Sequence, residues 1–104
     1  MRLVFTRAAA GDLDAIVNYI ALDDPAVAER VFRAIAAATE RLIEFPDMGH
    51  VGRVPDTREV MVAGLPYLIV YQVMADAVTI LAVFHGARDL ARAISRRRNE
   101  ATRP

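Results

Sequence analysis

The side chains best suited to chemistry gather in one short run, His85-Gly86-Ala87-Arg88-Asp89, which follows an apolar strand pattern. Histidine titrates near neutral pH, so His85 could serve as a general acid or base. Arg88 and Arg58 could hold a phosphate, because a guanidinium binds two phosphate oxygens at once. The alternatives are structural: His85 could cap the sheet edge, and Arg58 could pair with Glu59 or with an acidic partner.

Further candidates for contact with a partner are Tyr67 and the arginines of the C-terminal segment. Tyr67 and Tyr71 share strand parity with apolar neighbours, which predicts core rings with their hydroxyls at the rim, although they could also stack on bases. Arg92 and Arg96 are four residues apart and would share a helix face, with Arg97 and Arg98 following. These arginines could contact nucleic acid or an acidic protein, or could simply keep the chain soluble.

The remaining polar residues predict neither a metal site nor a cofactor. The chain has two histidines and no cysteine, and no carboxylate cluster accompanies His50 or His85. Asp12 and Asp14 are two positions apart, which puts them on different sides of a helix. We therefore expect them to favour the helix N-terminus electrostatically and to do nothing more.

Size and composition predict one soluble domain over residues 1–104, with a basic C-terminal segment at 91–104. The chain has 104 residues, a formal net charge of zero and 55% hydrophobic residues. It contains no apolar run of about 18 residues and no signal-peptide pattern, so we expect a cytoplasmic protein. The high apolar fraction suggests that some apolar surface serves a partner.

The hydrophobic patterns predict an α+β fold in the order β-α-α-β-β-β. Thr6 and Asp24-Pro25 are good helix starts, and Phe45-Pro46 is a good helix end. Short connections between the later strands require antiparallel neighbours. The expected elements are a strand at 3–5, helices at 7–22 and 25–44, a loop at 46–56, strands at 57–63, 67–73 and 78–85, a short helix through about residue 96, and a frayed end at 97–104.

The last two strands are apolar at nearly every position, which is typical of strands that are buried on both faces. An α-helical hairpin packed on a mainly antiparallel sheet covers only one of these faces. We therefore expect the other face to be exposed unless a partner covers it.

The order and spacing of several short motifs over residues 2–89 resemble the RelE/ParE toxin superfamily. These motifs are Asp12-Leu13, Tyr19-Ile20, Phe45-Pro46, Gly49, Thr57-Arg58-Glu59-Val60, Pro66-Tyr67, Ile69-Val70-Tyr71 and the closing run at 85–89. The resemblance implies a toxin of a type II toxin–antitoxin module, of the kind linked to plasmid stabilisation, that inhibits growth and is neutralised by a cognate antitoxin. It implies no membrane partner and no sequence-specific DNA binding by this chain alone.

The two branches of that superfamily imply different targets: RelE-like toxins cleave mRNA on the ribosome, whereas ParE-like toxins block DNA gyrase. The RelE-like branch carries basic residues on its second and third strands, where this chain has Glu59, Met61 and Leu68. Arg88 matches a catalytic arginine of that branch, but Ile94 lies near the position of its tyrosine. The departures favour a ParE-like inhibitor of gyrase that acts by binding and is not an enzyme.

Two alternatives stay open. One is a ribosome-dependent endoribonuclease, in which His85, Arg88 and Arg58 would be catalytic. The other is a module that has lost its toxicity and persists as a binding partner. For the inhibitor, the candidate partner-binding residues are Arg58, Tyr67, Arg88, Arg92, Arg96 and Arg97.

Overall fold

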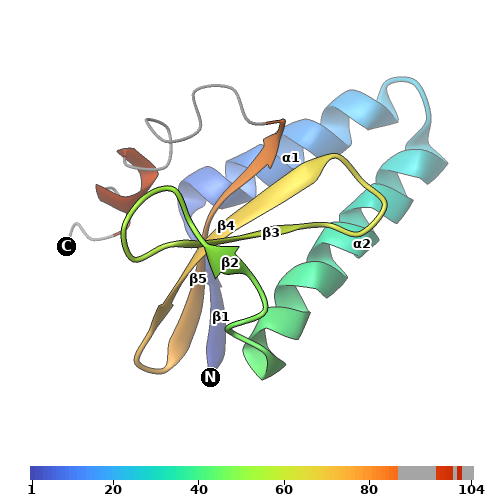
Figure 1. Ribbon diagram of the computed structural model, residues 1–104. Helices are drawn as coiled ribbons and strands as arrows, with labels where there is room; N and C mark the ends of the chain where they lie inside the picture. The colour runs from blue at the N-terminus through green and yellow to red at the C-terminus, as the bar shows by residue number, and fades with distance from the viewer. Residues whose placement is uncertain (87–95, 100, 102–104) are drawn as a thin grey trace.

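A five-stranded sheet with two helices on one of its faces forms the molecule (Figure 1). The structure is a computed structural model and describes residues 1–86, 96–99 and 101. Its elements are β1 (Arg2–Phe5), α1 (Arg7–Ala21), α2 (Pro25–Glu44), β2 (His50–Val51), β3 (Arg58–Met61), β4 (Tyr67–Met74) and β5 (Ala77–His85). The predicted α+β class and element order are confirmed.

The helices begin where their capping residues predict. The Thr6 hydroxyl accepts a hydrogen bond from the Ala9 amide at 3.0 Å, and the Asp24 carboxylate accepts from the first free amides of α2. These bonds satisfy donors that a helix start otherwise leaves unpaired. Pro25 occupies the first turn of α2 without loss, since its missing N–H would have no partner there.

The strand order is β1-β5-β4-β3-β2, and all pairs are antiparallel except β1 with β5. Sequence reasoning missed β2, which lies inside the predicted loop at 46–56. A strand of two residues is too short to show a periodic pattern. The strand predicted at 57–63 is also shorter in the structure, where β3 pairs with β4 only over Arg58–Met61.

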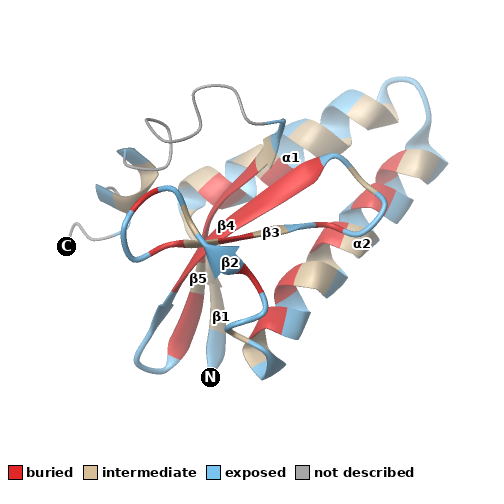
Figure 2. Cartoon of the chain, in the orientation of Figure 1, coloured by how far each residue is buried: buried red, intermediate tan, exposed pale blue. Residues whose placement is uncertain are grey.

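The main core lies between the sheet and the helices, where buried residues of α1 and α2 meet the inner face of β4 and β5 (Figure 2). Helical spacing places these side chains on one face of each helix. Its buried members include Leu13, Val31, Ile35, Leu42, Ile69, Tyr71, Ile80 and Val83.

The outer face of the sheet is also buried, contrary to the prediction that it waits for a partner. Val70 pairs with Ala82 and Tyr71 with Ile80, so Leu81 is an extra residue in β5 and forms a β-bulge. A second apolar cluster surrounds this bulge and includes Leu68, Val70, Leu81 and Ala82. Val54, from the β2–β3 loop, packs into the same cluster. Sequence patterning does not show that a loop folds back over a sheet, because that contact is tertiary.

Candidate functional site

The ring pair of Tyr67 and His85 marks the end of the sheet that the sequence singled out. Tyr67 begins β4 and His85 ends β5, and the two residues are register partners. Their ring centroids lie 5.3 Å apart at 75°, an edge-to-face contact. Tyr67 is buried, as predicted, whereas His85 is exposed. Gly86 follows with a φ of 80°, a backbone conformation that glycine adopts without strain.

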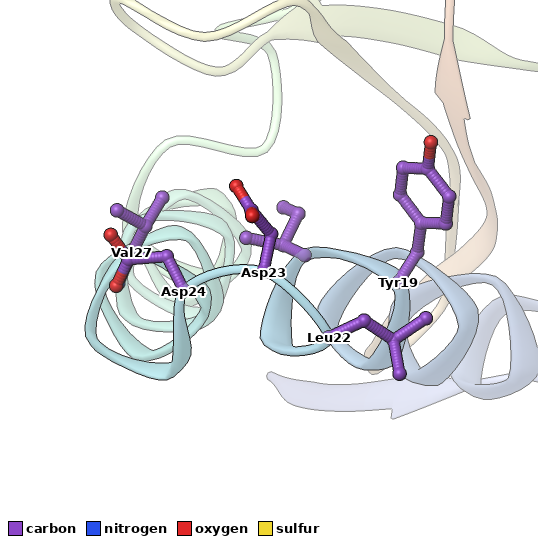
Figure 3. Close-up of a pocket in the computed structure, with 6 residues that line it drawn as sticks. Tyr19, Leu22, Asp23, Asp24 and Val27 are labelled. Carbon is purple, nitrogen blue, oxygen red and sulfur yellow. The ribbon is translucent and has the colours of Figure 1, made fainter.

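One hollow opens beside this ring pair, and a second hollow adjoins the first. The first, of about 480 Å³, lies between α1 and the sheet end and is lined by Ala15, Ile16, Tyr19, Ile20, Tyr67 and His85. The second, of about 510 Å³, lies at the turn between the helices (Figure 3) and is lined by Tyr19, Ile20, Leu22, Asp23, Asp24 and Val27. Tyr19 and Ile20 line both, so the two hollows share a wall.

Arg58 is held by the loop between α2 and β2. Its guanidinium donates to the Gly49 carbonyl at 2.7 Å and lies 3.5 Å from the Asp47 carboxylate. Arg58 thus has a structural role, one of the alternatives, but its partner is Asp47 and not Glu59, because neighbouring residues of a strand point to opposite faces. Arg58 pairs with Tyr71, four residues along β4 from the partner of His85, which corresponds to roughly 13 Å along the strand. The structure thus separates two of the three predicted nuclease residues, and the third, Arg88, lies outside the described residues.

Glu59 is a buried carboxylate at a position where the nuclease branch carries a basic residue. Its side chain is 1% exposed. One oxygen accepts a hydrogen bond from the Arg53 amide at 3.0 Å, and the other lies 3.7 Å from the Arg53 side chain and 3.6 Å from the His50 imidazole. A buried charge needs such partners, so Glu59 organises the loop that leads into β3.

The Tyr71 hydroxyl holds the loop between α2 and β2 in place. The ring is fully buried, and its hydroxyl accepts from the Gly49 amide at 2.9 Å and donates to the Pro46 carbonyl at 2.7 Å. The prediction of a hydroxyl at the rim is wrong, because residues 46–49 enclose it. Burial raises the pKa of the Tyr71 phenol, since the charged form would lose its hydration.

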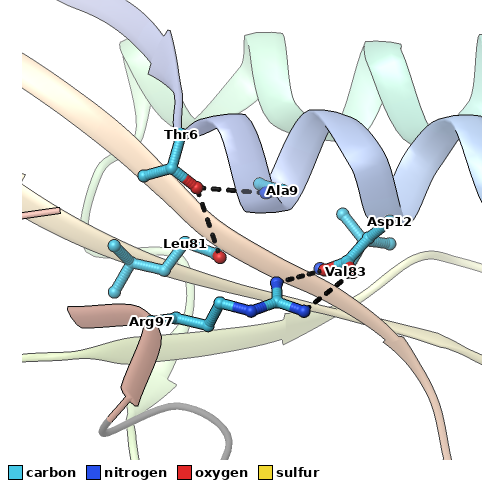
Figure 4. Close-up of polar contacts among 6 residues, drawn as sticks. All are labelled: Thr6, Ala9, Asp12, Leu81, Val83 and Arg97. Atoms are coloured by element: carbon cyan, nitrogen blue, oxygen red, sulfur yellow. Dashed lines mark hydrogen bonds and ion pairs between the residues drawn. The ribbon is translucent and has the colours of Figure 1, made fainter. Parts of the chain in front are cut away.

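Asp12 forms a clamp that sequence reasoning missed (Figure 4). Its carboxylate accepts a hydrogen bond from the Val83 amide at 3.0 Å and two from the Arg97 guanidinium at 2.8 and 3.1 Å. The last residue of β1, Phe5, pairs with Ile80, so β1 does not extend as far as Val83. The Val83 amide therefore has no carbonyl of β1 to bind, and the Asp12 carboxylate takes that place. The prediction of a purely electrostatic role for Asp12 is wrong.

The clamp also anchors Arg97, so the predicted fraying of residues 97–104 fails at residues 97–99. Residues 96–99 are helical, and the Arg97 guanidinium carbon lies 5.7 Å from the centroid of the Phe84 ring. Arg98 donates to the Pro55 carbonyl of the β2–β3 loop. Of the predicted contact arginines, Arg97 is bound within the chain and Arg96 is exposed. Arg92 lies outside the described residues.

Metal ligation and membrane insertion find no support in the described part of the chain. Within residues 1–86, 96–99 and 101, no three histidine or acidic side chains lie close enough to hold an ion. None of the described helices is long and apolar enough to cross a bilayer.

Comparison with known proteins identifies the family. The family model described as the ParE toxin of the type II toxin–antitoxin system parDE matches residues 3–90. Y4kP of Sinorhizobium fredii is 43% identical over 81% of this chain and 86% of its own length. Toxin RelE2 of Caulobacter vibrioides is 34% identical over 84% of this chain and 97% of its own.

Solved structures agree with this result. The chromosomal ParDE toxin–antitoxin system of P. aeruginosa contains a chain of the same fold, with a TM-score of 0.73, 28% identity, and coverage of 82% of this chain and 95% of that one. A chain of the E. coli RelBE toxin–antitoxin complex matches with a TM-score of 0.56 and 19% identity, covering 84% of this chain and 98% of that one, and shows the fold alone. The protein belongs to the ParE toxin family of type II toxin–antitoxin systems, within the RelE/ParE superfamily.

Proposed function

We propose that this toxin is ParE-like and inhibits DNA gyrase by binding to it. The observation that carries the proposal is that two positions where the nuclease branch has basic residues hold buried, non-basic side chains in this chain. Glu59 is a buried carboxylate with its own partners, and Leu68 is part of the apolar cluster on the outer face. Cleavage of RNA needs cations to stabilise the charge that develops on the phosphate. A buried acid and a buried leucine cannot supply them.

The structural comparison supports the same branch. The match to the ParDE chain has the higher TM-score and identity of the two structures described above, and the matching family model is that of the ParE toxin. The relative named RelE2 keeps the nuclease as the alternative. In either case, we propose that the protein acts in the cytoplasm, where both candidate targets are found.

We also propose that a cognate antitoxin neutralises this protein. The ParDE structure is that of a toxin–antitoxin system, and the RelBE structure is that of a toxin–antitoxin complex. Exposed cations are available for an acidic antitoxin, with Arg96 on the C-terminal segment and the partly exposed Arg53 and Arg58 around the β2–β3 loop.

Two assays on the purified toxin test the target: supercoiling of relaxed plasmid by gyrase, and protein synthesis in a cell-free system. We expect the wild-type protein to inhibit supercoiling and to leave mRNA intact on ribosomes. His85→Ala should retain growth inhibition, because loss of general acid–base catalysis typically costs about 100-fold or more and would be plain. Cleavage of mRNA that disappears in His85→Ala, with normal supercoiling in the presence of wild-type toxin, would establish the nuclease instead.

A further inference from the structure

The turn between α1 and α2 carries an unusual concentration of exposed apolar side chains. Leu22 is 86% exposed and Tyr19 is 78% exposed, the two highest values among the large apolar residues of the described chain. Both line the hollow at the turn, together with Ile20 and Val27. Single exposed apolar residues are ordinary, but several around one hollow mark an interaction surface. We call the surface formed by Tyr19, Ile20, Leu22, Asp23, Asp24 and Val27 the hairpin groove.

The hairpin groove has an acidic rim. Asp24 is engaged in capping α2, whereas the exposed Asp23 carboxylate has no hydrogen-bond or ion-pair partner among the described residues. The Tyr19 ring and the Asp23 side chain project to the same side of the turn (Figure 3). An apolar anchor and an unpaired charge are therefore presented together.

The C-terminal end of α1 adds to this negative character. A helix carries a partial negative charge at its C-terminus, which a basic residue in the last turn usually offsets. The last turn of α1 contains no basic residue. A cation from another molecule would meet both the helix end and Asp23.

The hairpin groove continues toward the end of the sheet that carries the ring pair of Tyr67 and His85. Its wall of Tyr19 and Ile20 also lines the neighbouring hollow, which reaches Tyr67 and His85. A bound segment could follow α1 from the turn to this ring pair, over two hollows of about 510 and 480 Å³.

We propose that the hairpin groove binds a segment of the toxin's target protein, one that inserts an apolar side chain beside Tyr19 and Leu22 and places a lysine or arginine next to Asp23. This inference rests on the proposed function, since it assumes a target that is bound and not cleaved. Charge argues for the target over the antitoxin: an antitoxin with acidic side chains fits the arginines around the β2–β3 loop and the C-terminal segment, whereas the groove has the opposite sign. A second copy of this chain fits poorly, because two acidic rims would repel each other when α1 packs on α1.

Three variants test the groove. Leu22→Asp removes the most exposed apolar side chain, Tyr19→Ser removes the ring, and Asp23→Lys reverses the unpaired charge. All three positions are exposed, so the fold should tolerate the changes. Matched controls lie elsewhere: Met74→Asp, at an apolar side chain that is 53% exposed at the end of β4, and Glu40→Lys, at an exposed acid on α2.

Each variant is co-expressed and purified with its antitoxin, released from it, and measured for growth inhibition and for inhibition of gyrase supercoiling. We expect the groove variants to lose at least tenfold in both activities, while the controls and all antitoxin complexes match the wild type. Thermal unfolding of each complex and of each released toxin confirms that the fold is intact.

The outcomes separate the two proposals. If the groove variants lose growth inhibition while wild-type toxin never affects gyrase, the groove inference stands and the proposed target is wrong. Unchanged growth inhibition in all three variants would overturn the inference. So would weakened antitoxin binding, which would make the antitoxin the occupant, or a change from dimer to monomer in size-exclusion chromatography, which would make it a second copy.

Discussion

The Asp12 clamp gives the sharpest test of the structure, because one carboxylate satisfies two separate groups. Asp12→Ala leaves the Val83 amide without a partner at a residue that is 2% exposed, which costs about 1–3 kcal/mol. It also removes both hydrogen bonds to Arg97, whose side chain is 23% exposed. Partial exposure reduces their contribution to about 1 kcal/mol. The free energy of unfolding should therefore fall by about 3 kcal/mol, which lowers Tm by more than about 10 °C in a domain of this size.

Two further variants divide this loss between the two partners. Asp12→Asn keeps an acceptor for the Val83 amide but loses the charge that attracts Arg97, so it should cost only about 1 kcal/mol. Arg97→Ala should cost a similar amount. Because Arg97 makes other contacts as well, the coupling energy from the double-mutant cycle is the quantity to compare, and we expect about 1 kcal/mol.

Urea unfolding measures these free energies, and hydrogen exchange reports on the Val83 amide directly. Its protection should fall in Asp12→Ala and persist in Asp12→Asn. Asp14→Ala is the matched control, since Asp14 is exposed on the same turn of α1, and it should stay within about 0.5 kcal/mol of the wild type. An Asp12→Ala protein as stable as this control, or a coupling energy near zero, would refute the clamp.

Three further variants test the loop between α2 and β2 and the C-terminal segment. Tyr71→Phe should lower the free energy of unfolding by about 1–3 kcal/mol in urea melts, because the Gly49 amide and Pro46 carbonyl lose their buried partner. Its raised pKa also predicts that wild-type stability declines as the pH rises above about 10, the usual pKa of a tyrosine, because the phenol ionises first in the unfolded state. Tyr71→Phe should lack this part of the decline. Gly49→Ala should destabilise the protein by about 1–3 kcal/mol, since its Cβ would lie 2.6 Å from the Tyr71 hydroxyl and 2.8 Å from a backbone oxygen; a fully stable variant would contradict the close approach. Removal of residues 91–104, which carry five arginines and one glutamate, should abolish growth inhibition while the antitoxin still copurifies through the partly exposed Arg53 and Arg58. Loss of the complex would place the antitoxin mainly on this segment.

Local sequence signals determined the helices of this protein. Thr6, Asp24, Pro25 and the Phe45-Pro46 pair act within a few residues of themselves, so the starts of both helices and the end of α2 follow from the chain directly. The long apolar strands follow for a similar reason, since nearly continuous apolar runs are typical of strands covered on both faces. The family likeness rested on the order of these elements and was confirmed.

Only the tertiary structure decided which groups meet across the chain. Asp12 and Arg97 are 85 residues apart, and Tyr71 and Pro46 are 25 apart. No periodicity links such pairs, because their contact depends on where one strand ends and how a loop returns. The bulge at Leu81 and the cover over the outer face of the sheet are of the same kind.

The candidate site shows the same division. Strand parity predicted that the Tyr67 ring is buried, and the apolar strand pattern put His85 at the end of the sheet. The engagement of Arg58 by Asp47 and Gly49, and the separation of Arg58 from His85, depend on strand register. Register is set by pairing between strands and by turn geometry, which act over distances that a single stretch of sequence does not encode.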